Sequence, residues 1–277
     1  MTLMHKAVLI LIPIVMLFSA GCKKTSTGIS YENPDLKVLF LHHSTGRNVW
    51  YGDVVQKKMG YLKETECMVP ELIREYNDRT GRKINVEERY FPGGNPYPWK
   101  NYPFDYYNIW VRNAGENPYM EEPTLEMLTK EYNVIIFKHC FPVSKIDEDD
   151  SNPDINSEKK TLANYKLQYE ALRDKLHQFP QTSFIVWTGA ALTESQTTPE
   201  EAARADEFYR WVKDTWDVAG DNIELFDFRV IETGGGLYLK PEFAVSKDDP
   251  HPNVKVSTIA AELLAKRIIE VIEMRDK

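Results

Sequence analysis

Short apolar runs alternate with amphipathic segments along most of the chain. Compact apolar runs predict strands, and apolar residues that recur every three or four positions predict helices. The expected strands are Val38–Leu41, Ile84–Phe91, Val134–Phe137, Ser183–Trp187 and Ile223–Phe228. The expected helices are Pro70–Asp78, Thr124–Tyr132, Thr161–Phe179, one that starts at Thr198–Pro199, and Val256–Met274.

Apolar strands that are each separated by a helix are typical of a parallel sheet covered on both faces. The pattern therefore predicts an α/β fold, a flavodoxin-like three-layer sandwich with a five-stranded parallel sheet. No internal repeat or low-complexity linker interrupts it, so we expect one domain over residues 35–277. In such sheets ligands bind outside the carboxyl ends of the strands. Reactive residues at strand ends are therefore the candidates for function.

The first 21 residues have the composition of an export signal. Lys6 is the only Lys or Arg among them, and the apolar run Ala7–Phe18 is too short to cross a bilayer. The run ends in small residues directly before Cys22, which resembles a lipoprotein signal. We therefore expect a signal peptide at 1–21, a lipid anchor on Cys22, a tether at 22–34 and a place in the bacterial cell envelope, on its periplasmic or surface face. The alternative is an ordinary secretory signal followed by an incidental cysteine.

Charge and spacing argue against two other classes of protein. Without the signal the chain has 33 basic and 42 acidic residues, which disfavours nucleic-acid binding. Clustered histidines can bind zinc, but no His-x-x-x-His or His-x-Glu spacing occurs here. We therefore expect no metal and no cofactor.

Four of the five histidines after the signal lie at predicted strand ends or in the loop before the last helix, namely His42, His43, His139 and His251. Ser44 follows the first strand, and Asp248 stands three residues before His251. A serine hydroxyl becomes a good nucleophile when an imidazole accepts its proton and a carboxylate orients that imidazole. These residues predict a Ser44–His251–Asp248 triad. The structural alternative for Ser44 is a helix or turn cap.

The chain resembles the SGNH/GDSL hydrolase superfamily over essentially its whole mature length. Asp248-x-x-His251-Pro252-Asn253, followed by Ile259-Ala260-x-x-Leu263, is similar to that family's last conserved block. His-His-Ser-Thr-Gly replaces Gly-Asp-Ser around Ser44, as in a branch that also has Lys-x-Cys-Phe-Pro after strand three. The resemblance implies ester hydrolysis, with Ser44 as nucleophile, His251 as base and Asp248 as its partner. It also implies an oxyanion hole formed by the backbone N–H groups of Ser44 and of Gly93 or Gly94.

One family motif is absent. The asparagine of Gly-x-Asn-Asp is replaced by Lys138-His139-Cys140. An oxyanion-hole donor contributes about 3–4 kcal/mol of transition-state stabilisation. The expected substitutes are His139, or else Asn48 or Asn95.

The segment Tyr90–Tyr119 holds ten aromatic residues among thirty, together with five prolines that prevent regular structure. Long ordered loops are frequently functional. One hypothesis is a sugar-stacking platform of Tyr97, Trp99, Tyr102 and Tyr106. The other is a loop packed on its own side chains.

Together these observations predict a serine ester hydrolase that removes O-acyl groups, O-acetyl in particular, from a glycan. Two alternatives remain at this point. One is a catalytically silent glycan-binding lipoprotein, and the other is a polysaccharide O-acetyltransferase that uses the same triad.

The two cysteines after Cys22 form a further prediction. Cys67 and Cys140 are both expected near the carboxyl edge of the sheet, so they could pair in an oxidising compartment. The alternative is two separate thiols.

Overall fold

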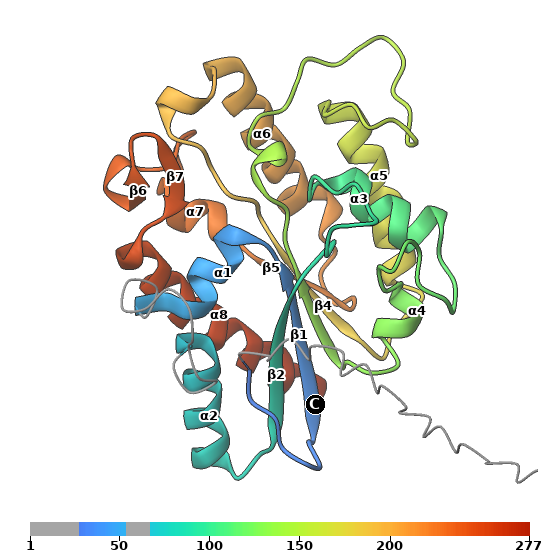
Figure 1. Ribbon diagram of the computed structural model, residues 1–277, viewed down its shortest axis with the longest axis vertical. Coiled ribbons are helices and arrows are strands. Elements are labelled where there is room, and N and C mark those ends of the chain that lie inside the picture. Colours follow the sequence, from blue (N-terminus) through green and yellow to red (C-terminus); the bar gives the residue numbers. More distant parts are fainter. Residues whose placement is uncertain (1–27, 54–66) are drawn as a thin grey trace, which may run out of the picture.

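The computed structural model describes residues 28–53 and 67–277, so the predicted signal peptide and Cys22 lie outside the described residues. Its centre is a parallel five-stranded sheet in the order β2-β1-β3-β4-β5 (Figure 1). The strands are β1 (Leu36–His42), β2 (Ile84–Tyr90), β3 (Val134–Phe137), β4 (Ser183–Trp187) and β5 (Ile223–Phe226). The predicted fold class is confirmed.

The strands β1, β3 and β4 are largely buried on both faces, which explains their nearly continuous apolar sequences. Successive side chains of a strand point to opposite faces of the sheet. In β1, Leu39 and Leu41 join one core cluster while Val38 and Phe40 join the other. All four residues of β3 are buried.

Helices cover the two faces in separate groups (Figure 1). One face packs against α1 (Ser44–Tyr51), α2 (Met68–Thr80), α7 (Phe228–Thr233) and α8 (Val254–Arg275). The other packs against α3 (Pro103–Tyr106), the π-helix Tyr107–Arg112, α4 (Leu125–Leu128), α5 (Leu162–Leu176) and α6 (Pro199–Trp211). None of the helices in the described part of the chain is long and apolar enough to cross a membrane.

The start of α6 follows from local chemistry. The Thr198 hydroxyl accepts the Glu201 backbone N–H, and the Glu201 carboxylate accepts the Thr198 backbone N–H. This capping box satisfies two of the donors that a helix leaves free at its first turn. The predicted start at Thr198–Pro199 is confirmed.

The prediction for residues 124–132 was too long. Helix α4 ends at Leu128. Beyond it the regular bonding pattern gives way, since the Glu131 and Tyr132 backbone N–H groups both donate to the Leu128 carbonyl. The segment reaches β3 through a turn.

A small antiparallel hairpin, β6 (Ala244–Ser246) and β7 (Asp249–Pro252), was not predicted. Its strands are short, and Pro250 and Pro252 remove two of the backbone donors that usually mark a strand. The hairpin leads into α8, whose first turn is capped by the Asn253 side chain. It therefore holds the residues before α8 in a fixed extended conformation.

Candidate active site

Ser44 and His251 meet at the carboxyl edge of the sheet. Ser44 is the first residue of α1, directly after β1, and is exposed to solvent. Its Oγ lies 2.8 Å from His251 Nε2 on β7, although the two residues are 207 positions apart. This is the distance at which a histidine can accept the serine proton.

Asp249 is the carboxylate that contacts the histidine. Its Oδ1 lies 2.6 Å from His251 Nδ1 and also accepts the His251 backbone N–H at 3.0 Å. A carboxylate can only accept, so the ring proton lies on Nδ1 and Nε2 is left to accept from Ser44. The Asp249 carboxyl is partly desolvated, which raises its pKa, but the two hydrogen bonds from His251 outweigh this and the pKa is lowered overall.

The prediction of Asp248 as this carboxylate was wrong. Residues two apart on a strand point to the same side, and Asp249 and His251 have that spacing on β7. Asp248 precedes the strand and is exposed, and its backbone N–H donates to Ser246 Oγ. The expected spacing of three applies to a turn, whereas the segment is extended.

Two side-chain amides fix the position of the β6–β7 hairpin. The Asn48 side-chain amide donates to the Pro252 carbonyl at 3.1 Å. Asn253 donates to the carbonyls of Glu242 and Ala244, across the hairpin. Asn48 therefore positions the histidine strand, in place of the oxyanion role expected for it.

The first turn of α1 leaves its amides open. The first N–H groups of a helix have no intrahelical acceptor, and His43, which precedes α1 with extended backbone, does not cap them with its side chain. Gly46 lies in this turn and packs so closely on His42 that a Cβ would overlap the His42 side chain. The first turn of α1, which carries Ser44, therefore packs directly against the end of β1.

Of the two glycines expected at the oxyanion hole, Gly93 is already engaged. Its N–H donates to the Glu122 carboxylate at 2.6 Å. Glu122 is buried and lies next to Met120 and Glu121, which both have positive φ. Gly94, at φ 109°, is the glycine whose amide remains a candidate.

His139 cannot act as the missing donor. It is wholly buried between aromatic rings, with centroids 4.6 Å from Tyr106 and 5.5 Å from Tyr169. Burial, and secondarily the Lys138 charge, hold its pKa well below the usual value, so the ring is neutral. The assignment of His139 to the oxyanion hole was wrong, because alternate residues after β3 turn into the core.

The residues around His139 lie nearer Ser44 and His251. The Lys138 side chain is buried beneath α1, with Cδ 3.0 Å from where a Gly46 Cβ would stand. Lys138 Nζ lies 3.5 Å from Cys140 Sγ, and the ring of Phe141 packs edge-on against the His251 ring at 5.2 Å. Asn95, the other expected substitute, is exposed in its loop.

Three of the four aromatic residues expected to form a sugar-stacking platform are buried. Tyr97, Tyr102 and Tyr106 are 0–3% exposed and belong to the core. Their hydroxyls are satisfied inside the protein, as in the Tyr106 bond to the Lys138 carbonyl at 2.9 Å and the Tyr97 bond to Asp105 at 3.1 Å. These three residues were wrongly placed on the platform.

Trp99 is the expected platform residue that does face outward. It is 39% exposed and stacks on His43 with 3.8 Å between ring centroids and 12° between planes. The opposite face of His43 stacks on Tyr90, which is 40% exposed. Burial lowers the His43 pKa to about 4, so the ring is neutral, and its Nε2–H donates to the Pro92 carbonyl. The sequence pattern gave no signal for this three-ring stack beyond the doublet His42-His43.

Cys67 and Cys140 are not joined by a disulfide. Cys67 is buried in the cluster on the α2 and α8 face, whereas the Cys140 backbone bonds to Asn101 in the loop over the other face. The Cys140 thiol lies 3.5 Å from Lys138 Nζ, beside the candidate site, so the two cysteines are separate thiols. Within the residues that the structure describes, no group of three or more His, Cys, Asp or Glu could hold a metal ion.

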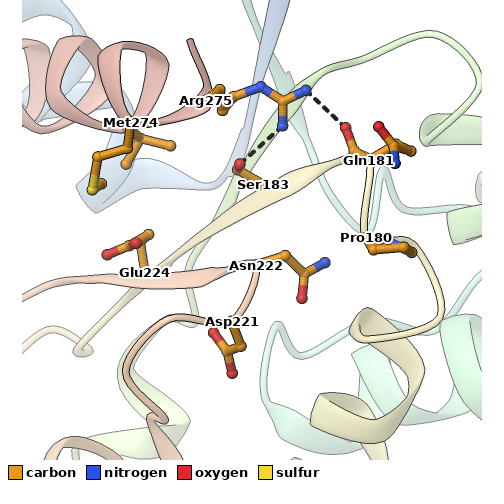
Figure 2. Close-up of a pocket in the computed structure, with 9 residues that line it drawn as sticks. Pro180, Gln181, Ser183, Asp221, Asn222, Glu224, Met274 and Arg275 are labelled. Atoms are coloured by element: carbon orange, nitrogen blue, oxygen red, sulfur yellow. Dashed lines mark hydrogen bonds between the residues drawn. The ribbon is translucent and has the colours of Figure 1, made fainter. Parts of the chain in front are cut away.

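A hollow of about 270 Å³ lies elsewhere, where Ser183 begins β4 and Asn222 precedes β5 (Figure 2). Arg275 crosses it and donates to Ser183 Oγ at 2.9 Å and to the Gln181 carbonyl at 2.8 Å. This is the amino edge of the sheet, opposite Ser44. The hollow is not part of the candidate active site.

No family model matches the chain, and no curated protein matches its sequence. Among solved structures, it is similar to a family two carbohydrate esterase from Clostridium thermocellum in complex with cellohexaose, with 11% identity and a TM-score of 0.43 over 88% of this chain and 67% of that one. It is also similar to a family two carbohydrate esterase from Cellvibrio japonicus, with 14% identity and a TM-score of 0.43 over 87% of this chain and 62% of that one. The chain thus spans about two thirds of the length of these proteins. Likenesses this distant carry no argument about what this chain does.

Proposed function

We propose that the chain is a serine ester hydrolase. The observation that carries the proposal is the continuous line of contacts from Ser44 Oγ through His251 to Asp249. In the proposed reaction Ser44 Oγ attacks the ester carbonyl carbon while His251 Nε2 takes the hydroxyl proton. His251 then gives that proton to the leaving alkoxide, and an acyl group remains on Ser44. Water, deprotonated by the same nitrogen, releases the acid and restores the serine.

The backbone N–H groups of Ser44 and Gly94 are the proposed donors to the oxyanion. Ser44 supplies the open amide of the first helical turn, and Gly94 supplies the loop amide that Glu122 does not occupy. Preorganised amides of this kind cost nothing to align during the reaction.

The proposed substrate is an O-acylated glycan, with acetyl as the preferred acyl group. Support comes from the exposed Trp99 face, stacked beside the nucleophile on His43, the residue that precedes Ser44. Aromatic faces offer apolar contact area at little entropic cost, which suits a sugar ring. The proposed envelope location would expose the protein to such polymers.

The test is acetate release from an acetylated polysaccharide. Wild-type protein should release acetate, and Ser44→Ala and His251→Ala should each lower turnover by several orders of magnitude. Adding an unacetylated oligosaccharide separates the two acceptors, because a transferase would acetylate it and a hydrolase would not. Retained glycan binding with no turnover would favour the silent binding protein.

The lipid anchor is a separate proposal. Cys22 follows a short apolar run and small residues, the pattern on which bacterial lipidation depends. Cells that express the protein and are fed a labelled fatty acid should incorporate the label, and Cys22→Ala should abolish incorporation. Labelled Cys22→Ala protein would contradict the anchor.

A further inference from the structure

A second carboxylate–histidine pair lies beneath the nucleophile. His42 is the last residue of β1 and is wholly buried. Its Nε2 lies 2.9 Å from a carboxylate oxygen of Glu88 on β2, at ion-pair distance. Its Nδ1 lies 2.9 Å from the His43 carbonyl oxygen.

That carbonyl belongs to the peptide group that supplies the Ser44 amide. A peptide unit is planar, and its C=O and N–H point in opposite directions. A carbonyl only accepts, so His42 Nδ1 donates to it, and so does the Arg47 backbone N–H at 3.0 Å. Two donors on the oxygen fix the orientation of the peptide plane. The Ser44 N–H must then point away from both donors, out of the buried side of the turn.

Glu88 lies against the other nitrogen of the same ring. Glu88 on β2 pairs with Phe40 on β1, so its side chain lies beside the ring of His42, two residues further along β1. Turning the His42 ring over would place carbons against both Glu88 and the carbonyl. The ring also packs against Phe40, with 4.4 Å between centroids and 41° between planes, and Gly46 lies against its other atoms. The buried His42 ring is therefore held between Phe40, Gly46 and Glu88.

We propose that His42 and Glu88 are positioning residues that aim the Ser44 backbone N–H at the oxyanion, an inference that rests on the proposed esterase function. The pair acts through the His43–Ser44 peptide and does not touch the substrate. In this chain the turn that carries the nucleophile has the sequence His-His-Ser, and the His42–Glu88 pair supports that turn.

The test compares three substitutions by the rate at which a fluorophosphonate labels Ser44 and by kcat and KM on nitrophenyl acetate. Removing one oxyanion donor typically costs about 10²- to 10³-fold. His42→Leu should therefore lower both the labelling rate and kcat by about a hundredfold, with KM nearly unchanged. His42→Asn keeps a donor near the place of Nδ1 and should recover at least part of that loss. Glu88→Gln should fall between wild type and His42→Leu.

A matched control uses His177 and Asp221, an exposed histidine–carboxylate pair with 2.8 Å between Nε2 and Oδ2. His177→Leu should leave the labelling rate and kcat unchanged. If His42→Leu fails to fold, His42→Asn and Glu88→Gln carry the comparison. Folded His42→Leu and Glu88→Gln proteins that label at the wild-type rate would overturn the inference and leave the esterase proposal intact. Wild-type protein that is folded but unlabelled would overturn the esterase proposal, and the inference with it.

Discussion

At the scale of single residues, strand spacing decides which carboxylate serves His251. Asp249 and His251 are two apart on β7 and share one side of the strand, whereas Asp248 lies outside the strand. The sequence placed Ser44 and His251 together because the carboxyl-end rule of parallel sheets applies to both their segments. It misplaced the carboxylate because a hairpin strand with two prolines has no recognisable apolar alternation.

The first prediction follows from this geometry. Asp249→Asn removes the acceptor that fixes the His251 tautomer, so kcat on nitrophenyl acetate should fall about a thousandfold or more. Asp248→Asn, one residue away on the exposed turn, should stay within about threefold of wild type. Equal loss in both variants, or a larger loss in Asp248→Asn, would contradict the assignment.

At the scale of elements, the first turn of α1 depends on the absence of a side chain at residue 46. Overpacking a tight contact typically costs about 1–3 kcal/mol. Gly46→Ala should therefore lower the free energy of unfolding by that amount and reduce kcat together, because the turn also carries Ser44. Urea titration and the ester assay measure the two effects.

Gly236→Ala is the control for that change. A Cβ at Gly236 would meet its nearest neighbour at 3.5 Å, an ordinary contact, and its φ is not positive. The variant should unfold within about 0.5 kcal/mol of wild type. A Gly46→Ala protein as stable and active as Gly236→Ala would contradict the close packing of α1 on His42.

The aromatic loop is the second element with a testable role. Composition predicted the loop but not which of its rings face outward. The buried hydroxyls of Tyr102 and Tyr106 donate to the carbonyls of Glu158 and Lys138, which lie far along the chain and give no local signal. Trp99 alone of the four keeps an exposed face.

Trp99→Ala should raise KM for acetylated glycan at least about tenfold, the equivalent of roughly 1.4 kcal/mol of lost contact. It should leave nitrophenyl acetate turnover nearly unchanged, since that substrate has no sugar to stack. Met120→Ala, which alters another exposed apolar residue, is the control and should change neither. Equal damage to both substrates in Trp99→Ala would show that the ring serves packing on His43 instead.

At the scale of the whole molecule, the five-stranded parallel sheet and the helices that cover it were predictable, because apolar periodicity and connection rules act over long segments. Contacts between side chains far apart in the sequence were not predictable. The expected disulfide is one example, since Cys67 is buried in the cluster with α2 and α8 whereas the Cys140 thiol lies beside Lys138. Buried carboxyl groups such as that of Glu232 likewise have no local sequence signal.

Burial raises the pKa of Glu232 to about 8, although the Ala191 backbone N–H and the charges of Arg229 and Lys138 oppose the rise. Between its ordinary value of 4.5 and that value, the folded state holds a proton that the unfolded state has lost. Stability should therefore fall as pH rises, by about 1.4 kcal/mol per pH unit, and level off above pH 8. Glu232 dominates the pH slope from roughly pH 7 to 8.5, because this window lies above the raised pKa values of Asp105 and Asp217 and above the ordinary histidine pKa of 6.5, at which the buried His43 and His139 contribute.

Urea unfolding at the two ends of that window measures the effect. Glu232→Gln should remove most of the fall and be more stable than wild type at the upper pH. Glu262→Gln, at an exposed position on α8, should follow wild type. A Glu232→Gln protein with the wild-type pH slope would show that another group titrates.

The most direct test of the central claim is the site of fluorophosphonate labelling, read by intact mass and peptide mapping. The Ser44–His251–Asp249 contacts predict a single adduct on Ser44 in wild type, none in folded Ser44→Ala, and a wild-type adduct in Ser195→Ala, a control at another exposed serine. Undiminished labelling of Ser44→Ala, or no labelling of folded wild-type protein, would contradict the assignment of Ser44 as an activated nucleophile.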